Sequence, residues 1–584
     1  MNNAQRSFAL GEVSPTLHAR ADLAAYQRAL RTLRNGVVSK EGGIVSRAGT
    51  LYKGTAKSAT VANVTRLIDC QFSSSQAYVL ELGNLYLRFW LNGVQVTFSA
   101  PSAWSVASVS YVAGDLVSHG GTNYLCILAN TSGAGNEPGT GGGAEEWYAQ
   151  TGVILEWPTS YATADLFRIK HKHPDATSVV LVHPSYAPKR LTRVAATNWT
   201  FATITLSSDL AAPTNLAVSG TNGSGWGYAI TAIDAAGVES AATSYVRTNI
   251  TVTDLFSLSA TLAAANRTVT WDAVTGAVKY KIYATSASTE VIARILGETT
   301  TNSYVDYGQW IFDPTVGLPP TSSGLFASTD NYPGAVAVHQ QRLLLGGTNN
   351  KPDVVYASRS GDPLNFSARS PIQDDDMMSW RHIGPRVDRV LDLLAVAEQL
   401  VGFGETAETF IRGDTDSILR PGEVNPQTFS HNGIAANLSP LPVNDTALYV
   451  QARGGVVRSL WPQEGGQGSD LSVTAFHLVR GYTVTDWCFQ QTPYAVAWMV
   501  RSDGALLSLT YARETGIVGW AHHDTDGSVE SVACVTEGAE DVVYLMVRRT
   551  IDGNAARYIE RLANRVTEWP DTVCMDSAVV AVEA

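Results

Sequence analysis

Residues 483–511 read TVTDWCFQQTPYAVAWMVRSDGALLSLTY. An apolar run is followed by a polar turn, a second apolar run, the pair Asp503-Gly504 and a third run that ends in polar residues. Valine, threonine and aromatic residues favour strands, and Asp-Gly favours a turn between them. The stretch therefore predicts consecutive short β-strands, with Trp487 and Trp498 in a buried core.

Segments of the same kind recur along the chain. Toward the C-terminus they repeat every ~40 residues, which is the spacing of four-stranded β-propeller blades. Trp520 and Tyr544 are further candidates for blade cores. The chain shows no WD or kelch signature, so this prediction depends on spacing alone. The other recurring segments are Thr65–Trp90, Phe167–Arg193, Gly334–Phe366, Val387–Phe410, Ile434–Trp461 and Trp520–Leu562.

Composition agrees with an all-β protein of several domains. Of 584 residues, only 16% are charged and 45% are hydrophobic, and there are 50 glycines. The five cysteines form no C-x-x-C pair and adjoin no histidine cluster, which predicts buried free thiols in a protein assembled in a reducing cytoplasm. Residues 1–20 lack the apolar core of a signal peptide, and no apolar run could span a bilayer, so we expect a soluble protein.

The charge of the chain argues against nucleic-acid binding. The net charge is −12, whereas DNA-binding proteins cluster lysine and arginine to neutralise phosphates. The densest basic stretch, Arg28–Arg34, has helical spacing, which favours a solvated or interface helix face. An acidic surface would suit a conduit along which DNA slides without adhering.

Two segments interrupt the recurring pattern. In residues 103–150, the framework Trp104, Tyr111, Gly114-Asp115, Tyr124 and Trp147 resembles the small chitin-binding-type carbohydrate module of family 5/12. Such modules stack sugar rings on exposed aromatic side chains, so the resemblance implies glycan contact through Trp104, Tyr124 or Trp147. Ile127-Leu128 stands where the family has an aromatic pair, and the alternative is that the remaining aromatics form a minimal core.

The second interruption, residues 210–308, resembles a fibronectin type III domain. Period-two alternation is clear in 228–234, YAITAID, and in 280–284, YKIYA. Trp271 would be the buried tryptophan of the β-sandwich. Domains of this kind serve in adhesion or packing and carry no chemistry of their own.

The N-terminal region carries a further family resemblance. Residues 6–50 read RSFALGEVSPTLHARADLAAYQRALRTLRNGVVSKEGGIVSRAGT, and the 3/4 spacing of Leu23, Tyr26, Leu30 and Leu33 predicts a helix over roughly 20–35, ended by Asn35-Gly36. Phe8–Pro15, Arg20–Asp22, Arg34-Asn35 and Gly42–Thr50 together resemble the opening of the tail nozzle (tail tubular B-type) proteins of short-tailed bacteriophages. Leu10 and Ala48 replace the usual glycine and proline.

The same resemblance returns beyond the second interruption. Its signature parts are Tyr332-Pro333-Gly334, Gln340–Leu343, Ser358–Asp362, Asn365-Phe366 and the block from Asp486 to Tyr511. With the N-terminal region, it covers the chain outside the two interruptions.

The resemblance implies a structural subunit of a podovirus tail, not an enzyme. It would form a hexameric nozzle in the distal part of the virion's short tail, below the adaptor and portal, and DNA would be ejected through it. The implied partners are further copies of the chain, the tail adaptor protein, tail fibre or spike proteins, double-stranded DNA that passes without sequence-specific contacts, and a host surface glycan. Assembly would take place in the host bacterial cytoplasm.

The first 50 residues are too few for a core of their own, and we expect them to pack across subunit boundaries or against the adaptor. The candidate interface residues are Arg20, Asp22, Tyr26, Arg34 and Arg47. A chain that lacks residues 1–50 is expected to fold as a monomer and to fail to join tails.

Short clusters of chemically active residues point to no reaction. Cation or zinc ligands are present in Asp374–Asp376, His522-His523-Asp524 and His171-Lys172-His173, but the spacing in each favours a solvated loop or turn. The sequence has no G-x-S-x-G elbow, P-loop or dinucleotide fingerprint. We therefore predict no catalytic, cofactor or metal residues. The alternative is a modular carbohydrate-active propeller enzyme or a glycan-binding protein.

The predicted architecture is mainly β: a β-propeller-like core with an N-terminal helical and extended arm and two inserted β modules. The expected boundaries are 1–60 for the assembly arm, 61–100 for the first propeller segment, 101–151 for the carbohydrate-module-like insert, 152–209 for a second propeller segment, 210–310 for the fibronectin-like insert and 311–584 for the remaining blades.

Overall fold

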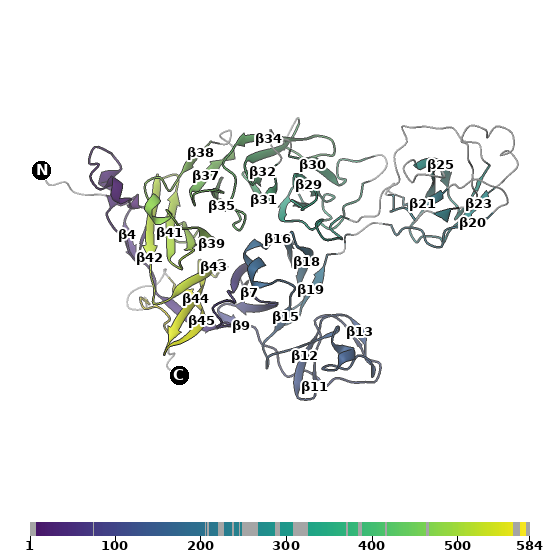
Figure 1. The fold of residues 1–584 in the computed structure, drawn as a ribbon, viewed down its shortest axis with the longest axis horizontal. Helices are drawn as coiled ribbons and strands as arrows, with labels where there is room; N and C mark the ends of the chain where they lie inside the picture. The colour runs from purple at the N-terminus through teal and green to yellow at the C-terminus, as the bar shows by residue number, and fades with distance from the viewer. Residues whose placement is uncertain are drawn as a thin grey trace.

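The structure is a computed structural model, and it describes residues 7–73, 75–204, 206, 210–219, 227–235, 239–243, 246–247, 267–285, 293–307, 325–368, 372–382, 388–414, 417–462, 467–564 and 573–579. The fold is mainly β, as predicted. Short antiparallel sheets stand side by side around a ring, and two further groups of strands lie outside it (Figure 1).

Seven sheets of the described chain each supply four strands to a blade of a β-propeller, and β9 and the arm strands β1 and β2 add to two of these sheets. In each, consecutive antiparallel strands run outward from the inner edge of the ring, where first strands such as β16 and β27, β39 and β43, and β43 and β6 contact each other. Blades 1 to 3 are β6 (Arg66–Ser73), β7 (Gln76–Gly83), β8 (Tyr86–Leu91) and β15 (Glu156–Pro158); β16 (Lys170–Asp175), β17 (Ser178–His183), β18 (Tyr186–Arg193) and β19 (Trp199–Thr203); and β27 (Ala335–His339), β28 (Arg342–Gly346), β29 (Val354–Ala357) and β30 (Met378–Arg381).

Blades 4 to 7 continue the ring. They are β31 (Val390–Val396), β32 (Gln399–Gly404), β33 (Glu408–Gly413) and β34 (Val424–Ser430); β35 (Leu441–Val443), β36 (Thr446–Val450), β37 (Val457–Trp461) and β38 (Gln467–Asp470); β39 (Val484–Gln490), β40 (Val496–Arg501), β41 (Leu506–Ala512) and β42 (Ile517–His523); and β43 (Ser528–Glu537), β44 (Glu540–Ile551), β45 (Asn554–Leu562) and β5 (Thr50–Thr55).

An apolar cluster fills each boundary between neighbouring blades, and the seventh cluster joins blade 7 back to blade 1. Because burial of apolar surface is the main stabilising term, this closed series of clusters holds the ring together. Trp487, Trp498, Trp520 and Tyr544 are all buried, which confirms their predicted place in blade cores. In order from the blade 1–2 boundary, representative pairs are Phe89 and Trp199, Val180 and Val336, Leu344 and Leu393, Phe403 and Tyr449, Leu448 and Trp520, Trp498 and Val543, and Tyr544 and Trp90.

The last blade is completed by a strand from the other end of the chain. β5 pairs antiparallel with β45, with Leu51 opposite Arg561 and Thr50 opposite Leu562. Closure of the propeller therefore requires residues separated by nearly the whole sequence to meet.

The N-terminal arm contains short strands and 3₁₀ turns: β1 (Gly11–Glu12), η1 (Pro15–Leu17), η2 (Tyr26–Arg28), β2 (Ala29–Leu30), β3 (Gly36–Val38) and β4 (Ile44–Ser46). The predicted helix over residues 20–35 is wrong. The backbone carbonyls of Arg28 and Leu30 accept hydrogen bonds from the N–H groups of Leu10 and Val13 at 3.1 and 3.0 Å. Pairing with a distant strand thus overrides the helical spacing of the apolar residues.

The two inserts form sheets of their own. In the first, β10 (Ser110–Tyr111) pairs with β13 (Asn130–Thr131), and β11 (Leu116–His119), β12 (Thr122–Cys126) and β14 (Trp147–Ala149) form a three-stranded sheet beside the turn η3 (Gly141–Gly143). The second is a sandwich of β20 (Ala217–Ser219), β23 (Arg267–Thr270) and β26 (Ser303–Asp306) against β22 (Val246–Arg247), β21 (Gly227–Ile233), β24 (Lys279–Thr285) and β25 (Ala293–Thr299). Trp271 lies in the core that the two layers share.

Three short elements complete the described structure. β9 (Val94–Gln95) pairs with β8, and the 3₁₀ turns η4 (Thr163–Arg168) and η7 (Phe476–Leu478) precede blades 2 and 6. Within the described ranges, no helix is both long and apolar enough to cross a membrane.

Candidate functional site

The N-terminal arm is joined to blade 6 through its backbone. β1 runs parallel to β42, and the N–H groups of Val518 and Trp520 donate to the carbonyls of Ala9 and Leu10 at 3.1 and 3.2 Å. Gly11 has φ +60°, and a Cβ there would lie 2.1 Å from the Trp520 carbonyl oxygen. Only glycine tolerates both that backbone conformation and that approach.

A buried carboxylate adds a polar joint between the arm and the propeller. Glu12 accepts hydrogen bonds from His522 Nδ1 at 2.7 Å, His477 Nε2 at 3.0 Å and the Leu33 N–H at 2.8 Å. Burial alone would raise the pKa of Glu12, but the hydrogen bonds from His477 and His522 outweigh it and lower the pKa to about 2. Charge-assisted hydrogen bonds of this kind hold the arm in one position.

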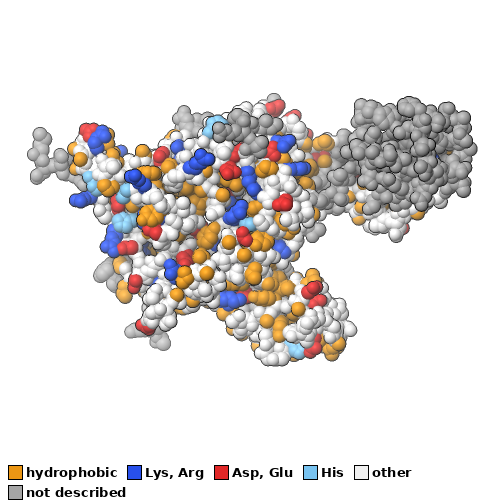
Figure 2. Space-filling model, in the orientation of Figure 1, with side chains coloured by type: hydrophobic (Ala, Val, Ile, Leu, Met, Phe, Trp, Pro, Cys, Tyr) orange, Lys and Arg blue, Asp and Glu red, His pale blue; other side chains and the backbone are white. Residues whose placement is uncertain are grey.

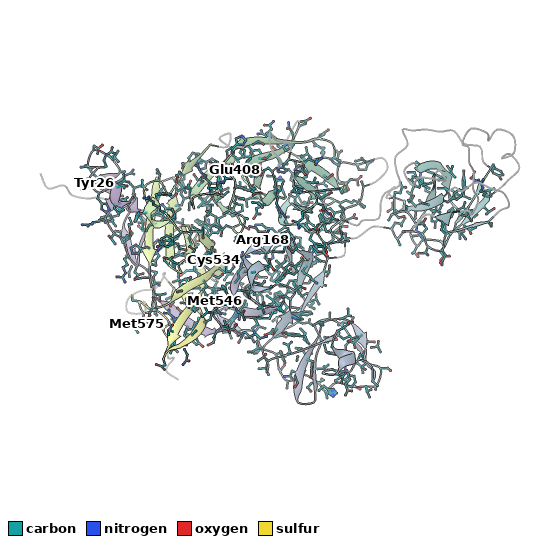
Figure 3. The ribbon with its side chains drawn as sticks, viewed as in Figure 1. Tyr26, Arg168, Glu408, Cys534, Met546 and Met575 are labelled. Carbon is teal, nitrogen blue, oxygen red and sulfur yellow. The ribbon has the colours of Figure 1, made fainter. Side chains whose placement is uncertain are left out.

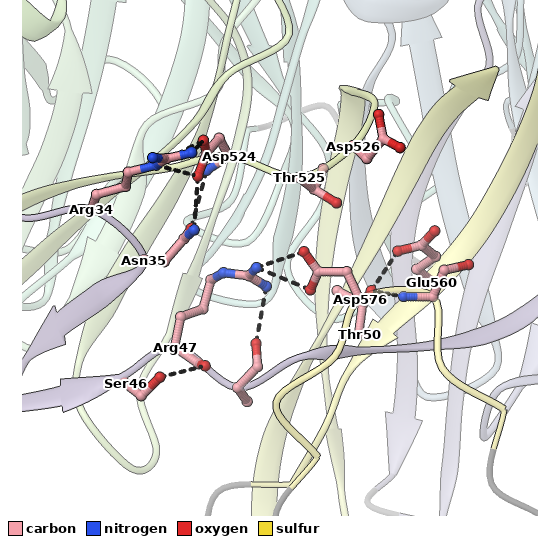
Figure 4. Close-up of polar contacts among 12 residues, drawn as sticks. Arg34, Asn35, Ser46, Arg47, Thr50, Asp524, Thr525, Asp526, Glu560 and Asp576 are labelled. Atoms are coloured by element: carbon pink, nitrogen blue, oxygen red, sulfur yellow. Dashed lines mark hydrogen bonds and ion pairs between the residues drawn. The ribbon is translucent and has the colours of Figure 1, made fainter.

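Two of the predicted interface residues, Arg34 and Arg47, form ion pairs with aspartates near the C-terminal end of the chain (Figure 4). Arg34 Nε lies 2.8 Å from Asp524 Oδ2, and Asn35 Nδ2 donates to the same carboxylate at 2.7 Å. Arg47 Nη2 lies 2.7 Å from Asp576 Oδ2. The Arg34 side chain is 65% exposed and that of Arg47 is 8% exposed, so the second pair is the more strongly shielded from solvent.

The Arg47–Asp576 ion pair holds the C-terminal segment, residues 573–579, beside β5. The N–H groups of Gly49 and Thr50 donate to the carbonyls of Val573 and Met575 at 2.8 and 3.0 Å. A Cβ on Gly49 would lie 2.1 Å from the Met575 carbonyl oxygen, so these two segments of the backbone approach too closely for any residue other than glycine. Residues 573–579 thus extend blade 7 beyond β5, where Leu51 bridges to Ala578.

The tip of the arm, residues 15–31, projects from the ring of blades (Figure 3). Arg20 and Asp22 form an exposed ion pair at 2.8 Å, and Tyr26 is 45% exposed. A hollow of about 560 Å³ is lined by residues that include Leu17, Leu23, Tyr26 and Arg31. Arg20, Asp22 and Tyr26 therefore lie on the surface of the tip, and their role between subunits stays a prediction.

The expectation that the chain folds without residues 1–50 is not compatible with the packing of the arm. Val37 belongs to the cluster between blades 6 and 7 that contains Trp498. Val38 packs with Ile517 of β42. Removal of these residues exposes two apolar clusters, so the arm must be probed at its tip instead.

In the first insert, the predicted glycan residues have different surroundings. Trp147 is 5% exposed and packs with Val117 and Cys126 in the core of the insert. Trp104 and Tyr124 are half-buried at the margin of this core. The faces of Trp147 are thus covered by protein, whereas Trp104 and Tyr124 retain solvent-exposed surface.

Another face of this insert packs against the propeller. Leu125 is fully buried in the cluster that contains Phe89 and Trp199, and Ile127 packs against the same cluster. Ile127 occupies the position where the carbohydrate-module family has an aromatic residue. Docking therefore accounts for the aliphatic side chain at position 127, which fits the apolar boundary of blades 1 and 2, whereas Leu128 is 56% exposed.

A buried carboxylate reinforces this attachment. Glu156, at the start of β15, accepts hydrogen bonds from Tyr148 Oη at 2.6 Å and from Arg88 Nε at 2.7 Å. Lys57 also contacts its carboxylate. Because Tyr148 belongs to β14 and Arg88 to β8, the insert is held to blade 1 by polar as well as apolar contacts.

The loops of blades 3 to 5 line a cavity of about 590 Å³, where the carboxylates of a glycosidase could lie. Asp388, Glu405 and His382 are among the residues that line it. Burial raises the pKa of Asp388, as a general acid requires, but its two carboxylate oxygens accept the N–H groups of Thr406 and Ala407 at 2.8 and 2.9 Å. In this geometry, the Asp388 carboxylate stabilises the turn between β32 and β33.

The three clusters weighed as metal sites are occupied in other ways. The Asp374 carboxylate lies 3.5 Å from Arg420 and the Asp376 carboxylate 3.8 Å from Arg359, and the backbone carbonyls of both residues accept hydrogen bonds from Arg342. His522 binds Glu12, whereas His523 contacts Ser508 Oγ at 2.7 Å. His171 lies 3.3 Å from Asp69. In the parts of the chain that are described, no group of three or more His, Cys, Asp or Glu side chains is arranged to hold a metal.

The cysteines only partly follow the expectation. Cys70, Cys126 and Cys488 are buried, as predicted, but Cys534 is half-buried and Cys574 is exposed. Cys574 lies in the C-terminal segment, which runs along the outer edge of blade 7.

Comparison with known proteins identifies one part of the chain. The profile of carbohydrate-binding module family 5/12 matches residues 103–147. No curated protein matches the sequence. Similar solved structures include the C-terminal WD40 domain of Sif2 (8% identity, 67% of this chain and 93% of that chain, TM-score 0.25) and the WD40 β-propeller domain of Doa1 (9%, 67% and 92%, 0.26). Another is Chaetomium thermophilum Raptor (9%, 67% and 27%, 0.28). The propeller assignment depends on the sheets and clusters described above.

Proposed function

We propose that this chain is a structural subunit of a bacteriophage short tail, which forms a hexameric nozzle below the adaptor and portal through which DNA is ejected. The observation that carries the proposal concerns the residues behind the family resemblance. Gly11, Glu12, Arg34 and Arg47 come from the quoted N-terminal motifs, and each makes a joint between the arm and the propeller. These motifs thus position a projecting tip on a rigid body.

The propeller body suits a static role. Its inner strands carry buried charges that pair between blades that are not neighbours. Lys170 of β16 in blade 2, for example, lies 3.2 Å from Asp392 of β31 in blade 4. Arg66 of β6 donates to the carbonyls of Leu166 and Ile169 at 2.8 Å. Such side chains lie on the innermost strands of the blades, beside the middle of the ring. A DNA conduit would therefore lie between subunits and not within one propeller.

The surface of the body is compatible with passing DNA. On the face shown in Figure 2, basic and acidic side chains are interspersed over the propeller. With a net charge of −12, the chain offers little attraction to a polyanion. A ring of such bodies would let double-stranded DNA slide without adhering.

Electron microscopy of the purified chain tests this proposal. Negative staining over a range of concentrations should show sixfold rings or short tubes. The variant Arg20→Ala/Tyr26→Ala, at the tip, should fold and form fewer rings. The matched control Val94→Ala changes a side chain that is 68% exposed and outside the arm, and should assemble normally. A chain that stays monomeric at every concentration would count against the nozzle.

A second candidate function, glycan binding, is favoured by the family match to residues 103–147. Trp104 and Tyr124 would contact the sugar, because aromatic faces stack on pyranose rings. Pull-down with insoluble chitin and with bacterial polysaccharides tests it: binding should fall in Trp104→Ala and persist in Leu128→Ala, whose side chain is 56% exposed. A reducing-sugar assay on the same polysaccharides separates a binder from a carbohydrate-active enzyme.

A further inference from the structure

Two cysteines face each other across the boundary between blades 6 and 7. Cys488 lies on β39 and Cys534 on β43, the first strands of these blades. Cys488 belongs to the apolar cluster between the blades, and Cys534 packs against it. Cys488 is 8% exposed, whereas Cys534 is half-buried and nearer to solvent. Cys534 lies toward the middle of the ring (Figure 3).

Hydrogen bonds between the same two blades lie on either side of this pair. Two residues before Cys488, Asp486 accepts hydrogen bonds from Ser531 Oγ at 2.5 Å and the Val532 N–H at 3.1 Å. Two residues after it, Gln490 Nε2 donates to the Asp541 carbonyl at 2.6 Å. Because side chains alternate along a strand, residues 486, 488 and 490 share the face toward blade 7.

The two thiols adjoin within this cluster. Burial raises the pKa of Cys488 well above its ordinary value, and a hydrogen bond with Cys534 raises it further. Cys488 is therefore a poor nucleophile toward reagents in solution, and the more accessible Cys534 is the thiol that an oxidant would meet first. The remaining cysteines provide internal references, because Cys70 lies in the blade 1–2 cluster and Cys574 on the surface.

The geometry points to a redox-active thiol pair, Cys488 and Cys534, which closes into a disulfide between blades 6 and 7 when the protein meets a small-molecule disulfide as oxidant. The Cys534 thiolate attacks the oxidant R′S–SR′, forms the mixed disulfide Cys534–S–SR′ and releases one R′S⁻. Cys488 then loses its proton to solvent and attacks the Cys534 sulfur, which releases the second R′S⁻. Two protein thiols are oxidised and one oxidant disulfide is reduced to two thiols.

The pair would be reduced inside a cell and oxidised outside it. Cytoplasmic thiols keep such pairs open, whereas an extracellular environment allows closure. The disulfide would link blade 6 covalently to the blade that β5 completes, and so would resist opening of the ring. This inference does not depend on the proposed tail function.

Oxidised glutathione, added to the full-length chain, tests the inference. Digestion without reduction, followed by mass spectrometry, should recover a disulfide-linked peptide pair that contains Cys488 and Cys534. Cys70 should stay free, and Cys574 should carry a glutathione adduct. The oxidised chain should melt at a higher temperature than the reduced chain, and dithiothreitol should reverse the shift.

Serine variants separate the two steps. In Cys488→Ser, Cys534 should stop at the glutathione adduct and the melting temperature should not rise. In Cys534→Ser, Cys488 should remain unmodified. Cys574→Ser serves as the matched control and should still form the bond. The inference is overturned if wild-type Cys534 stops at the adduct, as in Cys488→Ser, or stays free while Cys574 is fully modified.

Discussion

The N-terminal arm and the first insert both depend on the propeller, but they attach to it in different ways. The arm adds strands to the edge of blade 6 and fits a glycine against Trp520, whereas the insert presses an apolar face, with Leu125 at its centre, onto the boundary of blades 1 and 2. Edge pairing demands particular backbone conformations, and face packing demands only complementary volume. Edge pairing therefore restricts position 11 to glycine, whereas face packing accepts the aliphatic side chains of Leu125 and Ile127.

The largest expected effect breaks the edge attachment. Gly11→Val places a β-branched side chain at φ +60° and within 2.1 Å of the Trp520 carbonyl, so we expect a loss of about 3 kcal/mol or more in the free energy of unfolding. Urea denaturation followed by tryptophan fluorescence measures it. The control is Gly120→Val, which has φ +55° but nothing within 4 Å. Equal losses in both variants would show that the contact with Trp520 is unimportant.

The next prediction breaks the face attachment. Leu125→Ala leaves a cavity in the cluster with Phe89 and Trp199, and should cost about 3 kcal/mol. Leu128→Ala, three residues along the chain and 56% exposed, should change stability by less than about 0.5 kcal/mol. Denaturation curves of the two variants make the comparison. If Leu125→Ala were neutral, the insert would be an independent appendage.

A third prediction concerns acid. The pKa of Glu12 is lowered to about 2 in the folded chain from an ordinary 4.5, so the folded state binds fewer protons than the unfolded state between these values. The stabilisation is therefore complete above about pH 4.5 and is lost as the pH falls toward 2. We expect Glu12→Gln to cost about 2 kcal/mol at pH 7 and to be less acid-sensitive than the wild type. Identical slopes of stability against pH, from pH 5 to 3, would contradict this prediction.

The smallest effect is expected at the exposed ion pair. The side chains of Arg34 and Asp524 are 65% and 44% exposed, and exposed pairs are screened by water and salt. Arg34→Ala should leave the melting temperature unchanged at 0.15 M salt, an ionic strength at which the Debye length is about 8 Å. Differential scanning calorimetry checks this, with Arg47→Ala as the buried comparison. A clear loss in Arg34→Ala would mean that the arm relies on this pair.

Prediction from the sequence succeeded where the signal is local. The spacing of apolar segments indicated blades, and Trp487, Trp498, Trp520 and Tyr544 are buried in them. The framework of residues 103–150 indicated the carbohydrate-binding type of module that the family comparison supports. The predicted helix in the arm was wrong, because the 3/4 spacing of its apolar residues cannot reveal that their backbone pairs with β1.

The candidate site was harder to predict than the fold. The sequence named Arg34 and Arg47 as interface residues, yet their partners Asp524 and Asp576 are about 500 positions away. The histidines that bind Glu12 are 465 and 510 positions away from it. Cys488 and Cys534 lie on strands of two different blades, and one sequence holds no signal for either contact. The run His522-His523-Asp524 was the only signal near this site, and its spacing favours a loop over a metal site.

The sequence by itself determined that this protein is built of short strands with aromatic cores, since alternation and turn residues act over a few positions. Glycine is required at positions 11 and 49 for a tertiary reason, because the backbones of Trp520 and Met575 approach there. Only the tertiary structure decided that the described blades number seven, that β5 completes the last of them and that Trp147 is enclosed. Those outcomes depend on surfaces that meet after the chain has closed into a ring, and the energy of such contacts depends on both partners at once.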